Sequence, residues 1–492
     1  MAEQDTPTRI TRRDFAKTGA VVGLGTLLPA TANGWFQETT KSRGRVRYAI
    51  VGVGGRSQMY QKAINETFAQ DAELVACCDT NAGRLNLAKQ AAVAAGRPAP
   101  ALYAAADFDR MVAEAKPAFV IVTTPCGTHH TYTCRAMELG AGVISEKAMT
   151  VDAEQTQRVV DTQRRTGRAC RIMFNYRYSP PRTQVKDLLM SGVIGDVLSV
   201  DFHWMLNTSH GTDYFRRWHS YKRMSGGLMV HKATHHFDLV NWWLSSNPVS
   251  VYANGKREFY TPAMAKRLGL AGPHERCRTC PERQACGFEL DIEKNANLKK
   301  LYLDNEQYDG YFRDRCVFRP DIEIEDTMNV IVTYDNHVTL SYSLNAFNAW
   351  EGYVIVFNGT KGRIEHKVEE QVSTSGDGSV PGAIKGDGTY IRIYPLRQPA
   401  YEVKVWTGEG GHGGGDDVML KELFSPERVA DKYLRAADQR AGSYSALVGI
   451  AANRCFTTGQ PVEIASLVKN IGLPDYPAVP GHDQPVPMPK KG

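Results

Sequence analysis

The chain has 492 residues, of which 42% are hydrophobic and 23% charged, with a formal net charge of +6. This length predicts roughly two to four domains and excludes a chain too short to bury a core. Lysines and arginines are spread along the sequence rather than gathered in basic tracts, so we expect no nucleic acid partner. After the first 32 residues no apolar run reaches the roughly 18 residues of a membrane helix, so we expect no membrane insertion after processing.

The N-terminus differs from the rest of the chain. Arg12 and Arg13 precede Phe15 and Lys17, and a mildly apolar stretch then leads to Ala30-Thr31-Ala32, an A-x-A cleavage pattern. This order resembles a twin-arginine (Tat) export signal, which implies export through the Tat machinery to the periplasm, with the protein already folded. We therefore expect residues 1–32 to be a signal peptide, the alternative being a chance arginine pair on an N-terminal tail.

The region 44–167 alternates short β-branched runs with helical stretches, which is typical of βαβ units. Its predicted strands are nearly free of charge, as strands buried on both faces of a parallel sheet must be. They are Val46–Val51, Glu73–Cys78, Ala118–Thr124 and Gly142–Ser145, with helices such as Thr80–Ala95 and Thr128–Leu139 between them. We predict an α/β domain with a doubly wound parallel sheet of the Rossmann type.

Beyond about residue 190 apolar and polar residues alternate, which is typical of strands with one face buried and the other exposed to solvent. The predicted strands are Val197–Met205, Val249–Lys256, Thr327–Tyr334, Val338–Asn345, Tyr353–Phe357, Tyr390–Tyr394 and Tyr401–Val405. We predict an α+β domain over 168–464 with an open, mainly antiparallel sheet, and a C-terminal tail over 465–492. A cysteine-rich insert over about 262–319 and a Gly/Ser/Asp-rich loop over 369–388 interrupt this domain.

A glycine-rich turn follows the first predicted strand and opens a helix. It consists of Gly52, Gly54, Gly55, Arg56 and Ser57, with Val53 between the first two glycines. In the dinucleotide fingerprint such glycines let the backbone approach the pyrophosphate at a helix N-terminus. Asp79 ends the second predicted strand, where a carboxylate accepts hydrogen bonds from ribose hydroxyls and repels a 2′-phosphate. The pattern predicts NAD rather than NADP, with a ligand-free tight turn as the alternative.

Several short motifs near the strand ends carry a resemblance to a known family. They are Thr123-Thr124-Pro125, His129, Ser145-Glu146-Lys147-Ala148 and Phe174-Asn175-Tyr176-Arg177-Tyr178. On these motifs the chain resembles the glucose–fructose oxidoreductase / inositol dehydrogenase / MocA (Gfo/Idh/MocA) family from Val46 to about Ile464, although Ala148 stands where the family usually has proline. The resemblance implies that Lys147 orients and polarises the reacting hydroxyl. It also implies a nicotinamide site containing Thr124, Pro125, His129, Glu146, Lys147 and Asn175, with Tyr176 near the catalytic centre.

Residues 226–238 resemble the family's second catalytic block. The resemblance places His235 on the catalytic histidine and Asp238 on a second acid, while His231 stands where an aspartate is usual. On a single helix these three residues would share one face. A histidine, with a reference pKa of about 6.5, is suited to take the alcohol proton, so we predict His235 as the general base. His231 is a metal ligand, a substrate or proton-relay contact that with Lys232 binds an anionic group, or a structural residue.

Ten cysteines are present, and six of them are scattered at positions that suit small core residues. Cys277, Cys280 and Cys286 form a C-x2-C-x5-C pattern, and Cys316 follows some thirty residues later. Four such residues can hold a structural zinc ion or an iron–sulfur cluster, form two disulfides after export, or stay free thiols. The sequence leaves these four possibilities open.

A second glycine-rich segment, 410–417, lies between a predicted strand and a helix. Its glycine density would let His412 and Asp416 reach sugar hydroxyls. A flexible turn capped by an aspartate is the alternative.

Three classes of function follow from these patterns. The first is an exported oxidoreductase with tightly bound NAD, acting on a secondary hydroxyl of a sugar or polyol. The second is an NAD-dependent glycoside hydrolase, and the third is a binding protein that kept the fold without turnover. The family resemblance also implies a homo-oligomer formed through the exposed face of the antiparallel sheet.

Overall fold

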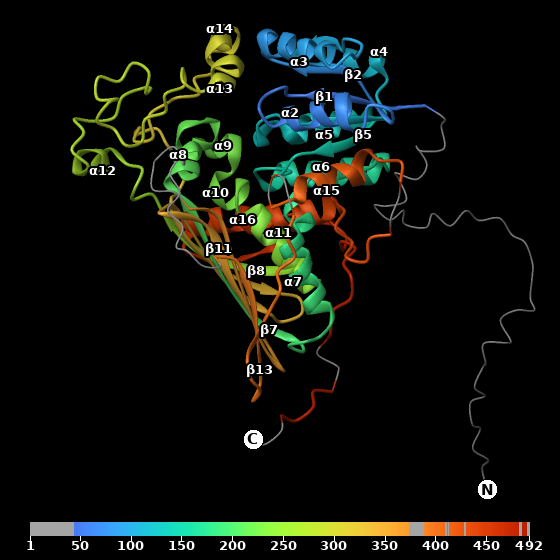
Figure 1. The fold of residues 1–492 in the computed structure, drawn as a ribbon, viewed down its shortest axis with the longest axis vertical. Coiled ribbons are helices and arrows are strands. Elements are labelled where there is room, and N and C mark those ends of the chain that lie inside the picture. Colours follow the sequence, from blue (N-terminus) through green and yellow to red (C-terminus); the bar gives the residue numbers. More distant parts are fainter. Residues whose placement is uncertain are drawn as a thin grey trace, which may run out of the picture.

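The structure, a computed structural model, describes residues 44–372, 388–408, 411, 413–427, 430–481 and 485–489. The predicted signal peptide over 1–32 and most of the predicted loop over 369–388 lie outside these residues. Two sheets with their helices are stacked, the N-terminal part at the top of Figure 1 and the larger C-terminal sheet below. Within the described ranges, no helix is long and apolar enough to cross a membrane.

The N-terminal domain is built on a seven-stranded sheet. Its strands are β1 (Val46–Val51), β2 (Ala72–Asp79), β3 (Ala101–Ala104), β4 (Phe119–Val122), β5 (Gly142–Ser145), β6 (Cys170–Ile172) and β15 (Ala437–Asp438). Their order is β15-β6-β5-β4-β1-β2-β3, and all neighbours are parallel except β15, which runs antiparallel to β6. The Rossmann-type sheet is confirmed, and the four predicted strands agree with the structure to within two residues.

Helices cover both faces of this sheet (Figure 1). They are α2 (Ser57–Lys62), which continues as a π-helical turn η2 (Ala63–Thr67), α3 (Ala82–Ala94), α4 (Phe108–Ala115), α5 (Cys126–Glu138), α6 (Ala153–Thr166) and α15 (Gly415–Phe424). Helix α16 (Gln439–Thr458) begins beside this sheet and packs mainly against the second domain. Successive residues of β1 enter two separate cores. Ala49 and Val51 pack with α4, α5 and α6, whereas Tyr48 and Ile50 pack with α2, α3 and α15. The doubly wound arrangement therefore follows from a strand whose two faces are both apolar.

The C-terminal domain is built on a nine-stranded sheet. Its strands are β7 (Val197–Asn207), β8 (Pro248–Lys256), β9 (Thr327–Tyr334), β10 (Thr339–Asn348), β11 (Trp350–Gly359), β12 (Gly362–Val372), β13 (Tyr390–Pro395), β14 (Tyr401–Val403) and β16 (Val462–Glu463). The order is β14-β13-β12-β11-β7-β10-β9-β8-β16, and each pair is antiparallel except β7 with β10. The predicted open, mainly antiparallel sheet is confirmed.

Strand β12 is absent from the sequence prediction. Residues 369–372, which we assigned to a loop, belong to this strand. Its inward positions are Ile364, His366 and Val368, and charged residues fill the positions between them. The buried His366 breaks the apolar–polar alternation, so the sequence pattern does not identify this strand. The prediction of a loop is wrong for residues 369–372.

The helices of the C-terminal domain lie mainly on one side of its sheet and at the junction with the first domain (Figure 1). They are α7 (Pro180–Met190), α8 (Thr208–Arg216), α9 (Lys222–Ser225), α10 (Gly227–His231), α11 (Thr234–Leu244), α12 (Pro262–Arg267), α13 (Ala296–Leu301) and α14 (Glu306–Asp309). Lys232 and Ala233 form a turn that separates α10 from α11, so this segment is two helices rather than one. The prediction that His231, His235 and Asp238 share one face of a single helix is therefore wrong.

Asp238 is a structural residue rather than an acid of the predicted site. Its carboxylate accepts two hydrogen bonds from the Arg177 guanidinium, at 2.6 and 2.7 Å, and both side chains are 1% exposed. This pair ties α11 to the 3-10 turn η4 (Asn175–Tyr178) that follows β6. Because its carboxylate is taken up by Arg177 and does not line the cavity described below, the structure favours a packing role for Asp238 over the role in chemistry that the resemblance implies.

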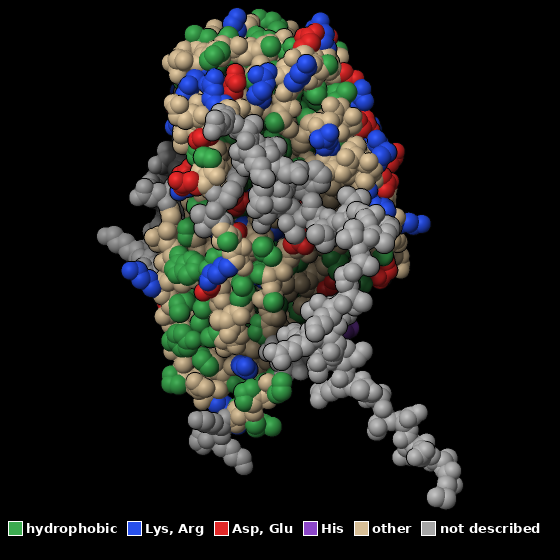
Figure 2. Space-filling model, turned by 90° about the vertical axis from the view of Figure 1, so that its right-hand side faces the viewer, with side chains coloured by type: hydrophobic (Ala, Val, Ile, Leu, Met, Phe, Trp, Pro, Cys, Tyr) green, Lys and Arg blue, Asp and Glu red, His purple; other side chains and the backbone are tan. Residues whose placement is uncertain are grey.

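The surface turned toward the reader in Figure 2 carries charges of both signs. Lys and Arg side chains are scattered among Asp and Glu over the described part of this face, and apolar side chains lie between them. The positive side chains of this face are thus not concentrated in one tract.

We expect Asp238→Ala to lower the free energy of unfolding by about 3–5 kcal/mol, because it leaves a buried guanidinium without its carboxylate. Urea denaturation measures the loss. Asp109→Ala, which removes a 57% exposed carboxylate paired with Arg135, is the matched control and should change stability by less than about 1 kcal/mol. A fully stable Asp238→Ala protein that lost only turnover would return Asp238 to the reaction chemistry.

Candidate active site

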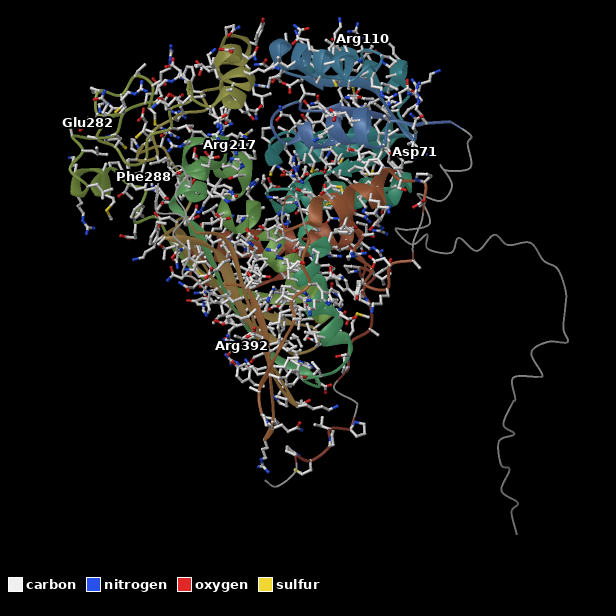
Figure 3. All side chains as sticks on the ribbon, viewed as in Figure 1. Asp71, Arg110, Arg217, Glu282, Phe288 and Arg392 are labelled. Carbon is white, nitrogen blue, oxygen red and sulfur yellow. The ribbon has the colours of Figure 1, made fainter. Side chains whose placement is uncertain are left out.

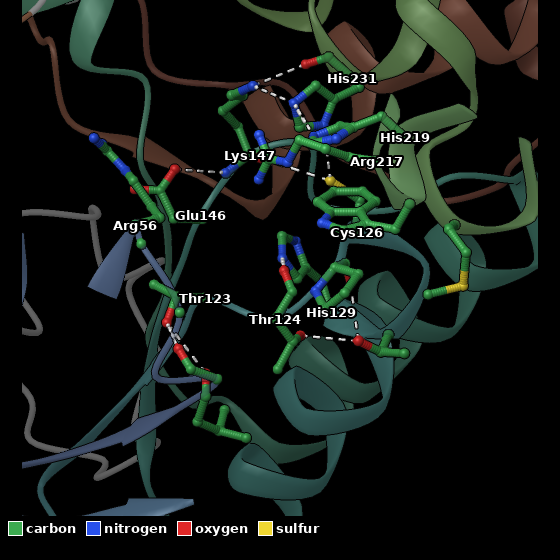
Figure 4. A pocket seen from close by; sticks show the side chains of 18 of the residues that line it. Arg56, Thr123, Thr124, Cys126, His129, Glu146, Lys147, Arg217, His219 and His231 are labelled. Atoms are coloured by element: carbon green, nitrogen blue, oxygen red, sulfur yellow. Dashed lines mark hydrogen bonds and ion pairs between the residues drawn. The ribbon is translucent and has the colours of Figure 1, made fainter. Parts of the chain in front are cut away.

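A cavity of about 600 Å³ opens where β1, β4 and β5 end, between the two domains. Most of the residues predicted from the sequence line it: Gly52, Gly54, Gly55, Arg56, Asp79, Thr124, Pro125, His129, Glu146, Lys147, Asn175, Tyr176, His231 and His235. Ser57 does not, because its hydroxyl donates to the Gly54 carbonyl at 2.7 Å and lies in the interior. Figure 4 shows Lys147 and His231 meeting in this cavity beside His219 and Cys126.

One end of the cavity is formed by the glycine turn and Asp79. Gly52 has a φ of 87°, and a Cβ there would lie 2.7 Å from the Thr124 nitrogen, so the turn requires glycine. The Asp79 carboxylate accepts the Val53 N–H at 2.7 Å and the Asn81 N–H at 2.8 Å. These bonds hold a carboxylate beside a close backbone turn, an arrangement that fits the ribose and pyrophosphate of a dinucleotide.

Residues 295–311 of the cysteine-rich insert cover this end of the cavity, and we call them the clasp. The Gly55 N–H donates to the Tyr302 hydroxyl at 3.1 Å, and Asp309 pairs with Arg84 at 2.5 Å. Arg84 also pairs with Asp79 at 3.2 Å, so one guanidinium joins the clasp to the predicted ribose site. In Figure 1 the helices α13 and α14 of the clasp lie beside α3. The insert therefore bridges the two domains across the dinucleotide cleft.

Lys147 follows β5 and is the central cation of the cavity. Its Nζ donates to the His231 carbonyl oxygen at 2.9 Å. The pKa of Lys147 is lowered to about 8, mainly by burial and also by the charges of Lys232 and Arg56, against the opposing effects of Cys126 and Glu146. The Glu146 carboxylate is turned toward Arg56, at 2.6 Å, and so does not neutralise the ammonium directly. The peptide bond between Lys147 and Ala148 is cis.

His231 makes three side-chain contacts that define its protonation. Its Nε2 lies 3.1 Å from His219 Nε2 and 3.4 Å from Lys147 Nζ, and its Nδ1 lies 3.2 Å from Cys126 Sγ. Burial and the charges of Lys147 and Arg217 hold the pKa of His231 well below its usual value. We therefore assign a neutral ring whose Nε2 accepts and whose Nδ1–H points to the Cys126 sulfur. In this state His231 positions Lys147.

His235 lies in the first turn of α11. Its ring stacks on that of Tyr176, with ring centroids 4.3 Å apart and an interplanar angle of 13°. The Tyr176 hydroxyl accepts a hydrogen bond from Lys232 at 3.2 Å, and burial raises the pKa of Tyr176 well above its usual value. Tyr176 thus stays protonated at neutral pH and orients His235. Lys232 also pairs with the buried Glu351 at 3.6 Å.

Two further predicted residues, His129 and Asn175, hold the walls of the cavity through hydrogen bonds. His129 places one ring nitrogen 2.7 Å from the Thr124 carbonyl and the other 2.8 Å from that of Ala148, which ties the end of β4 to the end of β5. Asn175 donates to Asp416 at 2.7 Å. Asp416 is not part of the cavity lining, and His412, its predicted partner toward sugar hydroxyls, lies outside the described residues.

The structure does not show the metal site that the sequence predicts at the cysteine cluster. Cys277, Cys280, Cys286 and Cys316 line one small cavity in the insert, but all ten cysteines are free thiols. In the described part of the chain, no group of three or more His, Cys, Asp or Glu residues is placed to hold a metal ion. Burial raises the pKa of Cys280 and Cys286, so without a bound ion both side chains are thiols. The zinc, iron–sulfur and disulfide predictions find no support in this arrangement.

The insert is held by ion pairs and backbone pairing instead. Arg276 pairs with Glu306 and with the buried Asp314, each at 2.7 Å. Cys277 N–H donates to the Asp314 carbonyl at 2.8 Å, and Cys316 N–H to the Glu275 carbonyl at 3.0 Å.

Several residues of the cavity were not found from the sequence. His219 and Arg217 lie on a short turn after α8, and Tyr302 and Tyr311 come from the insert. None of them belongs to a motif with fixed spacing. The one available signal was the aromatic and basic composition of Arg216-Arg217-Trp218-His219 in the middle of the second domain.

Comparison with known proteins agrees with this fold and with an NAD-binding first domain. Residues 46–174 match the family model for the oxidoreductase family's NAD-binding Rossmann fold, and residues 186–464 match its C-terminal alpha/beta domain, both of the Gfo/Idh/MocA type. The chain is similar to YteT of Bacillus subtilis (strain 168), described as an oxidoreductase, with 36% identity over 367 residues, 73% of this chain and 84% of YteT.

Two more distant proteins are also similar. Glycosyl hydrolase family 109 protein 2 of Akkermansia muciniphila is 24% identical over 446 residues, covering 87% of this chain and 84% of that protein. The WlbA dehydrogenase of Bordetella pertussis, solved with NADH and UDP-GlcNAcA, shares the fold with a TM-score of 0.56 and 19% identity, covering 85% of this chain and 98% of WlbA. On the two family matches, the chain belongs to the Gfo/Idh/MocA oxidoreductase family and is an NAD-binding oxidoreductase.

Proposed function

We propose that this chain is an exported oxidoreductase that keeps its NAD bound and oxidises a secondary hydroxyl of a sugar or polyol. The observation that supports it is that Lys147 and His235 line one cavity whose other end carries the glycine turn and Asp79. The WlbA structure, which contains a sugar nucleotide, supports a carbohydrate substrate. Export through the Tat machinery and periplasmic localisation rest on the sequence of residues 1–32 and are part of this proposal.

In this proposal Lys147 acts as a cation and His235 as a general base. NAD supplies the hydride acceptor when bound. The Lys147 ammonium lies beside the reacting oxygen and stabilises the negative charge that develops there. His235, held against Tyr176, takes the hydroxyl proton. His231 stays neutral and holds Lys147 through its carbonyl oxygen.

Retention of the cofactor follows from the clasp. Free NAD is not expected outside the cytoplasm, so an exported enzyme of this type must keep the cofactor with which it folded. Asp309 closes over Arg84, and Tyr302 reaches the glycine turn. Release of a dinucleotide from this cleft requires these contacts to open, which slows its dissociation.

We expect Tyr302→Ala to release NAD about 2–10-fold faster than the unchanged protein, because a neutral hydrogen bond worth roughly 0.5–1.5 kcal/mol is removed. NAD retained after extended dialysis, measured by absorbance and mass spectrometry, gives the rate. Lys299→Ala, which removes an exposed side chain of α13 that pairs with Asp304, is the control and should retain NAD fully. Equal retention by both variants would contradict a role of the clasp in holding the cofactor.

A second candidate is NAD-dependent glycoside cleavage, favoured by the similarity to the Akkermansia glycosyl hydrolase. Oxidation of a ring hydroxyl acidifies the neighbouring C–H, which permits elimination of the leaving group. Addition of water and return of the hydride then regenerate NAD, so no net oxidation occurs. The same Lys147 and His235 would serve the oxidation step.

Product analysis without added cofactor separates the two candidates. For an oxidoreductase we expect NADH to appear on the protein and a sugar or polyol to lose two hydrogens. For a hydrolase, an aryl glycoside loses its aglycone while NAD is unchanged. In either case Lys147→Ala and His235→Ala should each lower turnover by roughly 10²–10⁴, with NAD content unchanged. If neither product forms from a panel of sugars, polyols and glycosides, both candidates fail.

The pH dependence tests the charge on Lys147. Its pKa of about 8 means that the ammonium is lost as pH rises through this value. Since the ammonium is the stabilising form, we expect kcat/KM for oxidation to fall above pH 8 in the unchanged protein. Lys147→Arg keeps its charge and should lose this alkaline limb, at a lower maximal rate. A rate that instead rises through the same range would make Lys147 the base.

A further inference from the structure

We propose that the substrate of this site carries a carboxylate, as a sugar acid does, and that the guanidinium of Arg217 binds it. This inference rests on the proposed function and names the class of carbohydrate that the cavity takes. The inference rests on the position of Arg217, on the incomplete pairing of its guanidinium and on the charges of the residues around it.

Arg217 lies at the reaction end of the cavity. It follows α8 directly and precedes the short turn η5 (Trp218–Ser220), and its side chain, 26% exposed, lines the cavity. Figure 3 shows Arg217 in the interior beneath the clasp, whereas Arg110 and Arg392 lie at the periphery. In Figure 4 it lies next to His219 and Lys147. A substrate whose hydroxyl meets Lys147 therefore extends toward this guanidinium.

Arg217 is poorly neutralised by its own neighbours. Its nearest carboxylate, Asp213, is 3.7 Å away and makes a closer pair with Arg313 at 2.6 Å. Its Nε–H is buried and has no hydrogen-bond acceptor in the described ranges. An arginine presents a planar fork that matches a carboxylate with two parallel hydrogen bonds, and the Nε–H is one side of that fork.

The rest of the reaction end is also short of negative charge. Asp79, Glu146 and Asp309 are the carboxylates among the described lining residues, and each already pairs with an arginine. All three belong to the dinucleotide end or the wall beside it. The reaction end instead carries cations and imidazole rings: Lys147, Arg217, Lys232, His219, His231 and His235.

A neutral sugar would leave this guanidinium with only its long pair to Asp213 and its contact with Tyr311. An anionic substrate supplies a stronger partner, because a hydrogen bond to a charged group is stronger than one between neutral groups. Tyr311 of the insert lies beside Arg217 and narrows this side of the cavity. Lys232 is tied to Tyr176 and Glu351, which leaves Arg217 as the cation best placed for a carboxylate among the described residues.

The test compares hexuronates with the matching hexoses on the NAD-loaded protein. Binding of glucuronate, galacturonate, glucose and galactose is measured by calorimetry, and reduction of the bound NAD is followed separately. We expect the unchanged protein to bind at least one hexuronate about 10–100-fold more tightly than its matched hexose. Arg217→Gln should abolish this difference, Arg217→Lys should keep part of it, and the peripheral Arg110→Gln should leave it intact. Melting temperature and NAD content establish that each variant is folded.

The outcomes separate this inference from the proposed function. Equal binding of hexose and hexuronate, no binding of any hexuronate, or a preference that survives in Arg217→Gln overturns the inference. If hexoses then reduce the bound NAD, the proposed function stands without it. Hexuronate binding that depends on Arg217 but never reduces NAD supports the inference and contradicts the oxidoreductase proposal. If Arg217→Gln fails to fold, the partial preference of Arg217→Lys decides, because that variant keeps the charge and loses only the fork.

Discussion

A buried ammonium at the end of β5 is the charge on which the site depends. Lys147 is desolvated, and the surrounding groups compensate only in part: the carbonyl oxygen of His231 accepts a hydrogen bond from it, and Glu146 is turned to Arg56. The neighbouring imidazole of His231 remains neutral because a second buried positive charge beside Lys147 would be costly. The chemistry available here, stabilisation of a developing alkoxide, follows from that uncompensated charge.

The two domains contribute different parts of this environment. The parallel sheet supplies Asp79, Glu146 and Lys147 from strand ends that meet at one edge. The second domain supplies His231 and His235 from two short helices, and the insert covers the dinucleotide end. Because neither domain holds all the groups, the cavity exists only at their junction. The clasp strengthens this junction through the ion pair of Arg84 with Asp309.

Much of the fold and part of the site could be predicted from the sequence. Uncharged strands identify the parallel sheet, and the distance from Gly52 to Asp79 identifies the dinucleotide end, because both are local patterns. Tyr302 could not be found, since its contact with Gly55 joins residues 247 positions apart. His219 carries no motif, and its role depends on a ring that meets it from another helix. The end of α10 at His231 could not be predicted, because neither Lys232 nor Ala233 is a residue that usually ends a helix.

The central position of β7 has a consequence for folding. This strand pairs with β10 and β11, and contacts such as His203 with Ser343 and Ser199 with Asn358 join residues 140 and 159 positions apart. The middle of the larger sheet therefore stays without neighbours until the ribosome has made most of the chain. Long-range pairing of this kind makes folding slow. The smaller sheet, whose strands β1 to β5 are close in sequence, is able to form first.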